Sequence, residues 1–287
     1  MKDMNKKDTL LLLNNLRFKP NKKLGQNFLI DKNICKKILD EANLSVTDSV
    51  LEIGPGLGAL LKEILKSVKK VYAYEVDSIL FNYLKKEFSP NENLFLYNED
   101  FLGITHPKVD KVVSNIPYTI TGPIFEKVFY VNDPPEGILT IEKSIADRIF
   151  YPKKYKNLSR ISITFNAFMQ PISNYDIPSS AFYPEPRIKL SLIHVKSRKD
   201  INTFLLNQET KQFFLKLVQG IMPYKNKDIV NALTLHLKNN LNLQPPKQKI
   251  LELLDENSII NGKFAVLNVE YFIRLSKVLW EYIKDLN

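Results

Sequence analysis

The stretch Asn115–Tyr118 follows a short apolar run, at a point where a buried strand should end. An exocyclic aromatic amine is a poor nucleophile because its lone pair is shared with the ring, and two acceptors aimed at its hydrogens favour the reactive pyramidal form. The Asn115 side-chain oxygen and the Ile116 carbonyl suit that task, because Pro117 fixes φ and so aims the carbonyl. Tyr118 offers a face for a stacked base, a contact worth ~1–3 kcal/mol. These residues predict a catalytic site that grips an aromatic amine, with a plain turn as the alternative.

Glycine recurs at every second position of "LEIGPGLGALL", at Gly54, Gly56 and Gly58, after the acid Glu52. Glycines at a strand-to-helix turn let the backbone approach a ligand closely. The dinucleotide fingerprint is G-x-G-x-x-G, and the different spacing here favours the nucleoside pocket of S-adenosylmethionine enzymes. A nicotinamide dehydrogenase is therefore disfavoured, and a tight turn without ligand is the alternative. The expected reaction is direct attack of the amine on the sulfonium methyl group, accelerated by alignment and charge placement.

Two acidic residues complete the predicted cofactor pocket. Glu75 ends an apolar run, where its carboxylate can accept hydrogen bonds from both ribose hydroxyls, and Asp77 is the nearby second choice. Asp100 is placed to accept a hydrogen bond from an adenine amine, with Glu99 as its competitor. A helix N-cap is the alternative role for either residue of that second pair.

These residues follow β-rich apolar runs that alternate with helical patterns. Such alternation predicts an α/β fold, a Rossmann-like S-adenosylmethionine-dependent methyltransferase sheet that is parallel and has helices on both faces. Ligands bind beyond the carboxyl ends of such strands, where Gly54, Glu75, Asp100 and Asn115 all fall. The expected strands are 49–54, 70–77, 93–100, 111–116, 137–143, 158–169 and 188–196, and the expected intervening helices are 32–41, 57–68, 78–88, 122–129 and a start at 143–150.

The pattern changes after about residue 199, where four amphipathic helical segments follow one another. We therefore expect three parts: a basic N-terminal arm at 1–20 with one short helix, a methyltransferase domain at 21–198, and a small all-helical, RNA-associated C-terminal domain at 199–287.

Composition fits a globular protein with a polyanionic partner. The 287 residues are 44% hydrophobic, and 41 Lys and Arg against 31 Asp and Glu give a net charge of +10. One cysteine, Cys35, allows no disulfide framework, and the three histidines show no ligand spacing, so no metal is expected. We see neither a membrane-length apolar run nor a signal peptide, and we expect a cytoplasmic monomer.

Several motifs together resemble one family: "LGQNFLID", "LEIGPGLGALL", "VYAYEVD", "NEDF", "SNIPYTI" and "SSAFYPEPRIKLSLIHV" occur in the right order and spacing. The sequence is similar to the ribosomal RNA adenine dimethyltransferases, and specifically to their bacterial small-subunit, kasugamycin-sensitivity branch. The resemblance implies transfer of methyl groups from S-adenosylmethionine to the exocyclic amines of two adjacent adenosines near the 3′ end of 16S rRNA in the small ribosomal subunit.

The resemblance also implies site residues. It places cofactor contacts at Asn27 and Leu29 in addition to Gly54, Glu75, Asp100 and Asn115, and it places Phe182 beside the target base. Core packing of Phe182 is the alternative.

Basic residues cluster in three segments that we expect to contact RNA. These contacts would position the RNA without reading its sequence. The family has an arginine pair in the first part of the helical domain, and this chain has "MPYKNKDIVNAL" there instead. The expected RNA-binding residues are Arg17, Lys22, Lys23, Lys153, Lys154, Arg160, Lys225 and Lys227.

Two other functions remain open from the sequence. A large-subunit 23S rRNA adenine methyltransferase of the macrolide-resistance type would share the fold and "NIPY", but "GQNFL" and "SAFYPEPR" favour the small-subunit enzyme. A non-catalytic RNA-binding assembly factor would keep an idle pocket, and the intact Asn115–Tyr118 stretch argues against it.

Overall fold

The computed structural model describes residues 5–21, 24–150, 158–264 and 267–285. Contacts divide the chain into two compact units. The first contains residues 1–129, 134–146 and 171–197, and the second contains residues 130–133, 147–170 and 198–287. The predicted boundary at residue 199 stays a prediction, and the second unit also includes segments that precede it.

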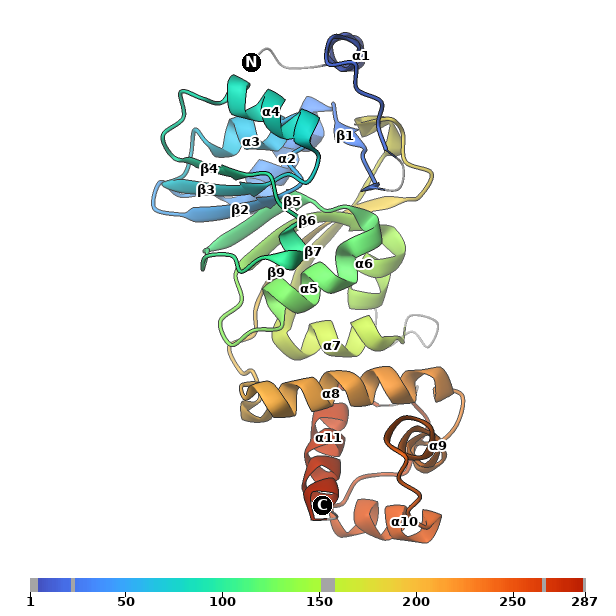
Figure 1. Cartoon of the computed structure of the whole chain (residues 1–287). Coiled ribbons are helices and arrows are strands. Elements are labelled where there is room, and N and C mark those ends of the chain that lie inside the picture. Colours follow the sequence, from blue (N-terminus) through green and yellow to red (C-terminus); the bar gives the residue numbers. More distant parts are fainter. Residues whose placement is uncertain (1–4, 22–23, 151–157, 265–266, 286–287) are drawn as a thin grey trace. The chain divides into compact units, whose positions relative to one another are not determined.

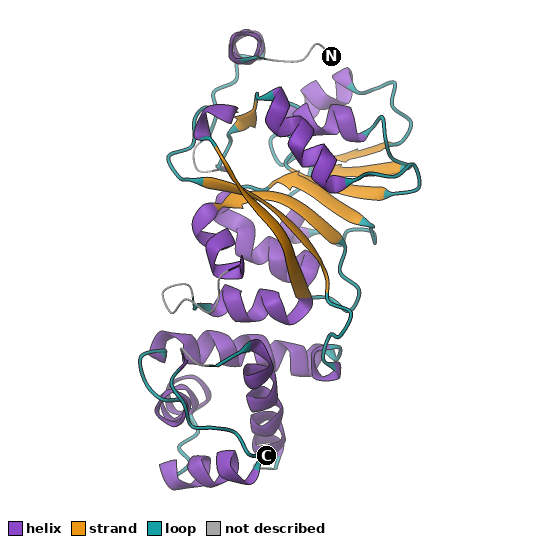
Figure 2. Cartoon of the chain, turned by 180° about the vertical axis from the view of Figure 1, so that it is seen from behind, coloured by secondary structure: helices purple, strands orange, loops and turns teal. Residues whose placement is uncertain are grey.

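The first unit is built on a seven-stranded mixed sheet with helices on both faces (Figures 1 and 2). The five strands β2 to β6 are parallel to their neighbours, and β9 is antiparallel to β6. This confirms the predicted α/β class, but the sheet is mixed and not wholly parallel as predicted, because β9 joins it antiparallel. In sheet order the strands are β4 (Leu94–Tyr97), β3 (Lys70–Tyr74), β2 (Ser49–Ile53), β5 (Lys111–Asn115), β6 (Glu136–Glu142), β9 (Leu190–Ser197) and β7 (Met169–Ile177).

Helices cover this sheet as the apolar spacing predicts. In Figure 1, α2, α3 and α4 lie on one face and α5 lies on the other. The buried side chains of α2 and α3 join Val50, Val71 and Val113 of the strands in one core cluster. The helices, with the N-terminal α1 and with α6, are α1 (Lys6–Asn15), α2 (Lys32–Ala42), α3 (Ala59–Ile64), α4 (Ser78–Glu87), α5 (Thr121–Phe129) and α6 (Lys143–Phe150).

The sheet order places a topological switch point between β2 and β5, because β3 and β4 lie on one side and β6 on the other. Ladder pairing between β2 and β5 covers Val50 with Lys111 and Leu51 with Val112. Further on, the Ser114 hydroxyl replaces the ladder, since Oγ accepts from the Ile53 N–H at 3.2 Å and donates to its carbonyl at 2.6 Å. Ligands of open α/β sheets bind at such a switch point.

A second, two-stranded sheet joins segments far apart in the sequence. Strand β1 (Phe28–Leu29) pairs antiparallel with β8 (Phe182–Tyr183), and Leu29 lies opposite Phe182. The Ile30 N–H extends the pairing by donating to the Ala181 carbonyl at 2.9 Å. The "GQNFL" and "SAFY" motifs are therefore bonded to each other.

The second unit is helical apart from the start of β7. Helices α7, α9 and α11 each contact α8, and α10 contacts α9. Phe213 of α8 meets Trp280 of α11 edge to face, with ring centroids 5.2 Å apart. The helices are α7 (Arg160–Phe168), α8 (Gln208–Ile221), α9 (Ile229–Leu241), α10 (Lys247–Glu256) and α11 (Val269–Lys284).

One predicted strand, at 158–169, is wrong, because most of that segment forms α7. Ser159 caps this helix by accepting from the Ser162 N–H, and the Ser162 hydroxyl closes the capping box. Most residues of α7 are buried against other parts of the fold. This tertiary packing outweighs the β preference of "ISITF". The strand that follows, β7, is not among the strands expected from the sequence.

Among the described residues, no helix is long and apolar enough to cross a bilayer.

Candidate functional site

A pocket opens at the carboxyl ends of the parallel strands, at the switch point between β2 and β5. Eight residues that the sequence analysis assigned to a cofactor or catalytic role line it together. They are Asn27, Leu29, Gly54, Gly56, Glu75, Asp100, Asn115 and Pro117. The fold thus brings these strand ends and the N-terminal "GQNFL" segment to one cavity.

The glycine turn requires glycine because its backbone has positive φ angles and because buried rings leave no room for a side chain. Gly56 has φ of +61°, and a Cβ there would lie 3.0 Å from Phe28 Cδ1. Gly58 has φ of +79°, and its Cβ would lie 2.8 Å from Phe88 Cε2. A side chain at either position would strain the backbone and displace a buried ring.

Glu75 is 4% exposed and holds this turn with its carboxylate. Oε2 accepts from the Gly56 N–H at 3.0 Å, and Oε1 accepts from the Asp77 N–H at 3.0 Å. Burial raises the pKa of Glu75, the charge of Asp77 raises it further, and these backbone hydrogen bonds oppose the rise. Asp77 instead caps α4 through the N–H groups of Ile79 and Leu80. Glu75 lines the pocket and Asp77 does not, and the role of Glu75 as ribose acceptor stays a prediction.

The wall near Asp100 is aromatic. Tyr74 stacks on Tyr97 at 4.9 Å and meets Phe101 edge to face at 5.4 Å. Asp100 Oδ1 accepts from the Leu102 N–H at 2.9 Å and caps the short helix η2 (Phe101–Gly103). Glu99 also lines the pocket, so the choice between Glu99 and Asp100 stays a prediction.

Asn115 ends β5 with its amide oriented by the chain. Its Nδ2 donates to the Asn27 carbonyl at 3.1 Å. Its Oδ1 is buried and has no hydrogen-bond partner within the described part of the chain. Such an acceptor is costly to leave unpaired, so this oxygen is suited to receive a donor from a ligand. Pro117 follows with φ of −57°, the ordinary value for proline, and the aim of the Ile116 carbonyl stays a prediction.

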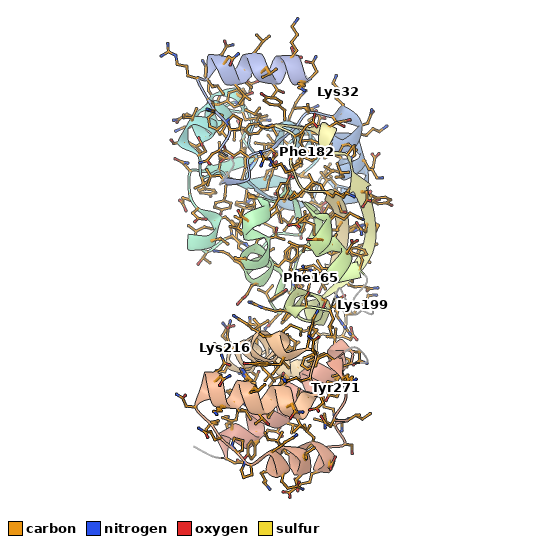
Figure 3. All side chains as sticks on the ribbon, turned by 90° about the vertical axis from the view of Figure 1, so that its right-hand side faces the viewer. Lys32, Phe165, Phe182, Lys199, Lys216 and Tyr271 are labelled. Carbon is orange, nitrogen blue, oxygen red and sulfur yellow. The ribbon has the colours of Figure 1, made fainter. Side chains whose placement is uncertain are left out.

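Ile116, Tyr118 and Phe182 lie differently from the rest. None of the three is among the residues that line the pocket, and the Ile116 side chain is fully buried. Phe182 is 1% exposed and belongs to the main core cluster, against which Tyr118 packs. Figure 3 labels Phe182 among the side chains of the sheet unit. The contact of Tyr118 and Phe182 with a target base stays a prediction, and Phe182 would have to leave its buried position to make that contact.

Glu52 was noted in the sequence without a role, and the structure places it in the pocket. It lines the pocket, is 2% exposed, and its Oε2 has no partner among the described residues. Burial raises the pKa of Glu52 well above the ordinary value, and the charge of Glu75 adds to the rise. The raised pKa favours the neutral carboxylic acid in the ligand-free pocket, and a bound cation would favour the charged carboxylate.

We expect Glu52→Gln to raise the stability of the ligand-free protein by about 1–2 kcal/mol, since the amide has no charge to desolvate. The folded protein binds this proton more tightly than the unfolded chain does, so wild-type stability should rise as pH falls through the raised pKa of Glu52. The Gln variant should lose that part of the pH dependence. Calorimetric melting across pH measures both effects. Glu92→Gln at an exposed site is the control, and a lower melting temperature for Glu52→Gln at neutral pH would contradict the assignment.

The predicted RNA-binding residues fall in both units. Arg17 is exposed after α1, and Lys227 is exposed before α9. Arg160 donates to the Gln219 side chain at 3.2 Å, and Lys225 donates to the Leu158 carbonyl at 2.9 Å, so these basic residues gather at α7 and the end of α8. Their contacts with RNA stay predictions. Lys22, Lys23, Lys153 and Lys154 lie outside the described residues.

Within the described ranges, no three His, Cys, Asp or Glu side chains lie together as metal ligands would.

The glycine turn, the unpaired oxygens of Glu52 and Asn115, and the aromatic wall together fit a nucleoside that carries a cationic group.

Comparisons with known proteins match this picture. The family model described as ribosomal RNA adenine dimethylase matches residues 17–264. The "Ribosomal RNA small subunit methyltransferase A" of Bacillus pumilus is 32% identical over 281 residues, covering 93% of this chain and 94% of the relative. The "Probable ribosomal RNA small subunit methyltransferase A" of Methanococcoides burtonii is 37% identical over 233 residues, covering 80% of this chain and 83% of the relative.

Two solved structures share the fold. A dimethyladenosine transferase from Plasmodium falciparum aligns with a TM-score of 0.73 at 24% identity, covering 90% of this chain and 98% of that one. The 23S rRNA methyltransferase ErmE aligns with a TM-score of 0.61 at 23% identity, covering 88% of this chain and 99% of that one.

Proposed function

Because the chain belongs to the ribosomal RNA adenine dimethylase family, we propose that it methylates small-subunit rRNA at the exocyclic amines of two adjacent adenosines near the 3′ end of 16S rRNA, with S-adenosylmethionine as donor. The observation that carries this proposal is the unpaired Oδ1 of Asn115 at the end of β5. The amide is oriented by the hydrogen bond that its Nδ2 donates to the Asn27 carbonyl. The substrate follows from the relatives named for the small subunit.

The residues that would hold the donor are those of the pocket. The glycine turn and Glu75 would take the ribose, Asp100 the adenine amine, and Asn27 and Leu29 the amino-acid part. Glu52 adds a carboxyl group near the positive charge. When bound, S-adenosylmethionine supplies an electrophilic methyl group on its sulfonium.

The transfer centre would be formed by Asn115 and the residues that follow it. Asn115 Oδ1 and the Ile116 carbonyl would accept the two amine hydrogens of the target adenine, which directs the nitrogen lone pair toward the methyl group. A bound donor would supply the methyl group to this nitrogen and leave as S-adenosylhomocysteine, and the proton that the amine gives up would pass to water. No residue of the chain has to be covalently modified, so alignment and oriented acceptors supply the acceleration.

The large-subunit alternative is not favoured. The similarity to the 23S rRNA enzyme at 23% identity shows the shared fold alone, whereas the curated relatives above 30% identity are named for the small subunit. An idle assembly factor is not favoured either, since the pocket and the Asn115 acceptor are intact. We propose that the enzyme acts in the cytoplasm as a monomer, on the small subunit or its precursor.

The direct test is incubation of the protein with labelled S-adenosylmethionine and small ribosomal subunits that lack these methyl groups. Label should appear on two adjacent adenosines near the 3′ end of 16S rRNA, mapped by primer extension or mass spectrometry. Large subunits in a parallel reaction are the control. Label on 23S rRNA, or on no rRNA at all, would contradict the proposal.

A further inference from the structure

Lys127 is a partly buried cation on the last turn of α5, and its ammonium group points to the loop after β4. Nζ donates to the Leu102 carbonyl at 3.0 Å and also to the Ile104 carbonyl. These carbonyls belong to η2 and to the residue after it. One side chain therefore joins α5 to the loop that begins with Asp100.

The same ammonium group lies beside the aromatic wall of the pocket. It is 5.1 Å from the centroid of the Phe101 ring, a cation–π distance. Phe101 is 3% exposed and packs between Tyr74 and His106, with centroid distances of 5.4 Å and 5.3 Å. Lys127 thus contacts the loop on its backbone and on the ring that faces the pocket.

Charge completes the arrangement. Burial lowers the pKa of Lys127, and the negative charge of Asp100 opposes that change. Asp100 Oδ1 caps η2 by accepting a hydrogen bond from the Leu102 N–H. The Leu102 carbonyl in turn accepts a hydrogen bond from Lys127 Nζ. The position of the Asp100 carboxylate therefore depends on a turn whose carbonyls Lys127 holds. The hydrogen bonds to these carbonyls offset the cost of burying part of the charge.

We propose that Lys127 is a positioning residue for cofactor specificity: it fixes the loop at residues 100–104 so that Asp100 meets the amine of an adenine ring. The inference rests on the proposed function, because it names how that pocket selects its nucleoside. Lys127 need not touch the cofactor, and it acts through the loop.

The position of Lys127 on α5 adds a second connection. Thr119 and Ile120, just before α5, line the same pocket, and this helix follows the Asn115–Tyr118 stretch. One helix therefore supports both the adenine side of the pocket and the transfer centre. Loss of the Lys127 contacts should affect nucleoside recognition first, because the hydrogen bonds of Asn115 do not involve this loop.

The test compares two ligands in calorimetry, S-adenosylhomocysteine and S-inosylhomocysteine, which has a carbonyl oxygen in place of the adenine amine. Wild type should prefer the adenosyl ligand. Lys127→Met should raise the Kd for the adenosyl ligand about tenfold and change the inosyl Kd by less than about twofold, so the preference should fall. Lys127→Gln keeps a hydrogen-bond donor group, so its Kd for the adenosyl ligand should lie between those of wild type and Lys127→Met. If the Met variant does not fold, the Gln variant takes its place in the same comparison. Lys86→Met, at an exposed site near the end of α4, is the matched control.

If Lys127 had a merely structural role, its loss would weaken the binding of both ligands equally and leave the ratio of their Kd values unchanged. That result would overturn the inference. Asp100→Asn should reduce the ratio as the Lys127 variants do. If wild type fails to bind S-adenosylhomocysteine, the proposed function fails. If wild type binds it and discriminates, but the Lys127 variants keep the ratio, only the role of Lys127 fails.

Discussion

Replacing Asn115 with alanine should lower the rate of methyl transfer to rRNA by about 10²–10³-fold, the usual effect of losing one preorganised polar group at a transfer centre. The reason lies in the Asn115 amide: Nδ2 is fixed on the Asn27 carbonyl, and Oδ1 is left as a buried, unpaired acceptor. Alanine removes that acceptor, and the target amine loses a partner for one of its hydrogens. Single-turnover labelling of small subunits at saturating donor measures the effect on the chemical step.

Three controls make this result specific. Asn115→Asp keeps acceptor oxygens but loses the donor to Asn27, so it should retain more activity than the alanine variant. Asn33→Ala, at an exposed position of α2, should behave as wild type. Cofactor affinity of Asn115→Ala, measured by calorimetry, should change far less than the rate. Wild-type labelling by the alanine variant would refute the catalytic assignment.

Glu75→Ala should raise the Kd for S-adenosylmethionine about 100-fold, since hydrogen bonds to a charged group are each worth roughly 1.5–3 kcal/mol. The carboxylate is 4% exposed and accepts from the backbone N–H groups of Gly56 and Asp77. Its removal therefore loosens the glycine turn in addition to deleting the proposed ribose acceptor. Isothermal titration calorimetry measures the change, and Glu92→Ala at an exposed site is the matched control.

The pH dependence of cofactor binding provides an independent check on Glu75. Burial raises its pKa, so protonation should begin at a higher pH than for an ordinary glutamate. Cofactor affinity should fall as pH falls through that raised pKa, because the protonated group is a poorer acceptor. The stability of the ligand-free protein should change in the opposite direction over the same range, since the folded form binds the proton more tightly. An affinity that is constant down to the ordinary glutamate range would contradict the assignment.

The strand ends were readable from the sequence because each apolar run stops at a residue that does not belong in a core. Gly54, Glu75, Asp100 and Asn115 stand at such ends, and parallel strands necessarily bring their carboxyl ends to one edge. The segment at 158–169 was misread because "ISITF" has strand preference, while the Ser159 capping box and the packing of α7 on α8 and α11 make it a helix.

Other features of the site depend on neighbours that the sequence does not place. An aromatic residue in a loop motif reads the same whether it faces a ligand or the interior, and Phe182 is 1% exposed. Lys127 occupies an ordinary position in a helical pattern, and only the fold brings it to the loop after β4. Glu52 reads as one acid in a glycine motif, and its unpaired oxygen becomes evident only once the strands around it are known.

The short pairing of β1 with β8 has a mechanical consequence. Leu29, which lines the pocket, is the register partner of Phe182, which is packed inside. If Phe182 moved outward to contact a nucleotide, either Leu29 would have to move with it or the hydrogen bonds between β1 and β8 would have to break. If Phe182 contacts the target base as proposed, binding of the donor and binding of RNA would be coupled, and each would change the affinity for the other by the same factor.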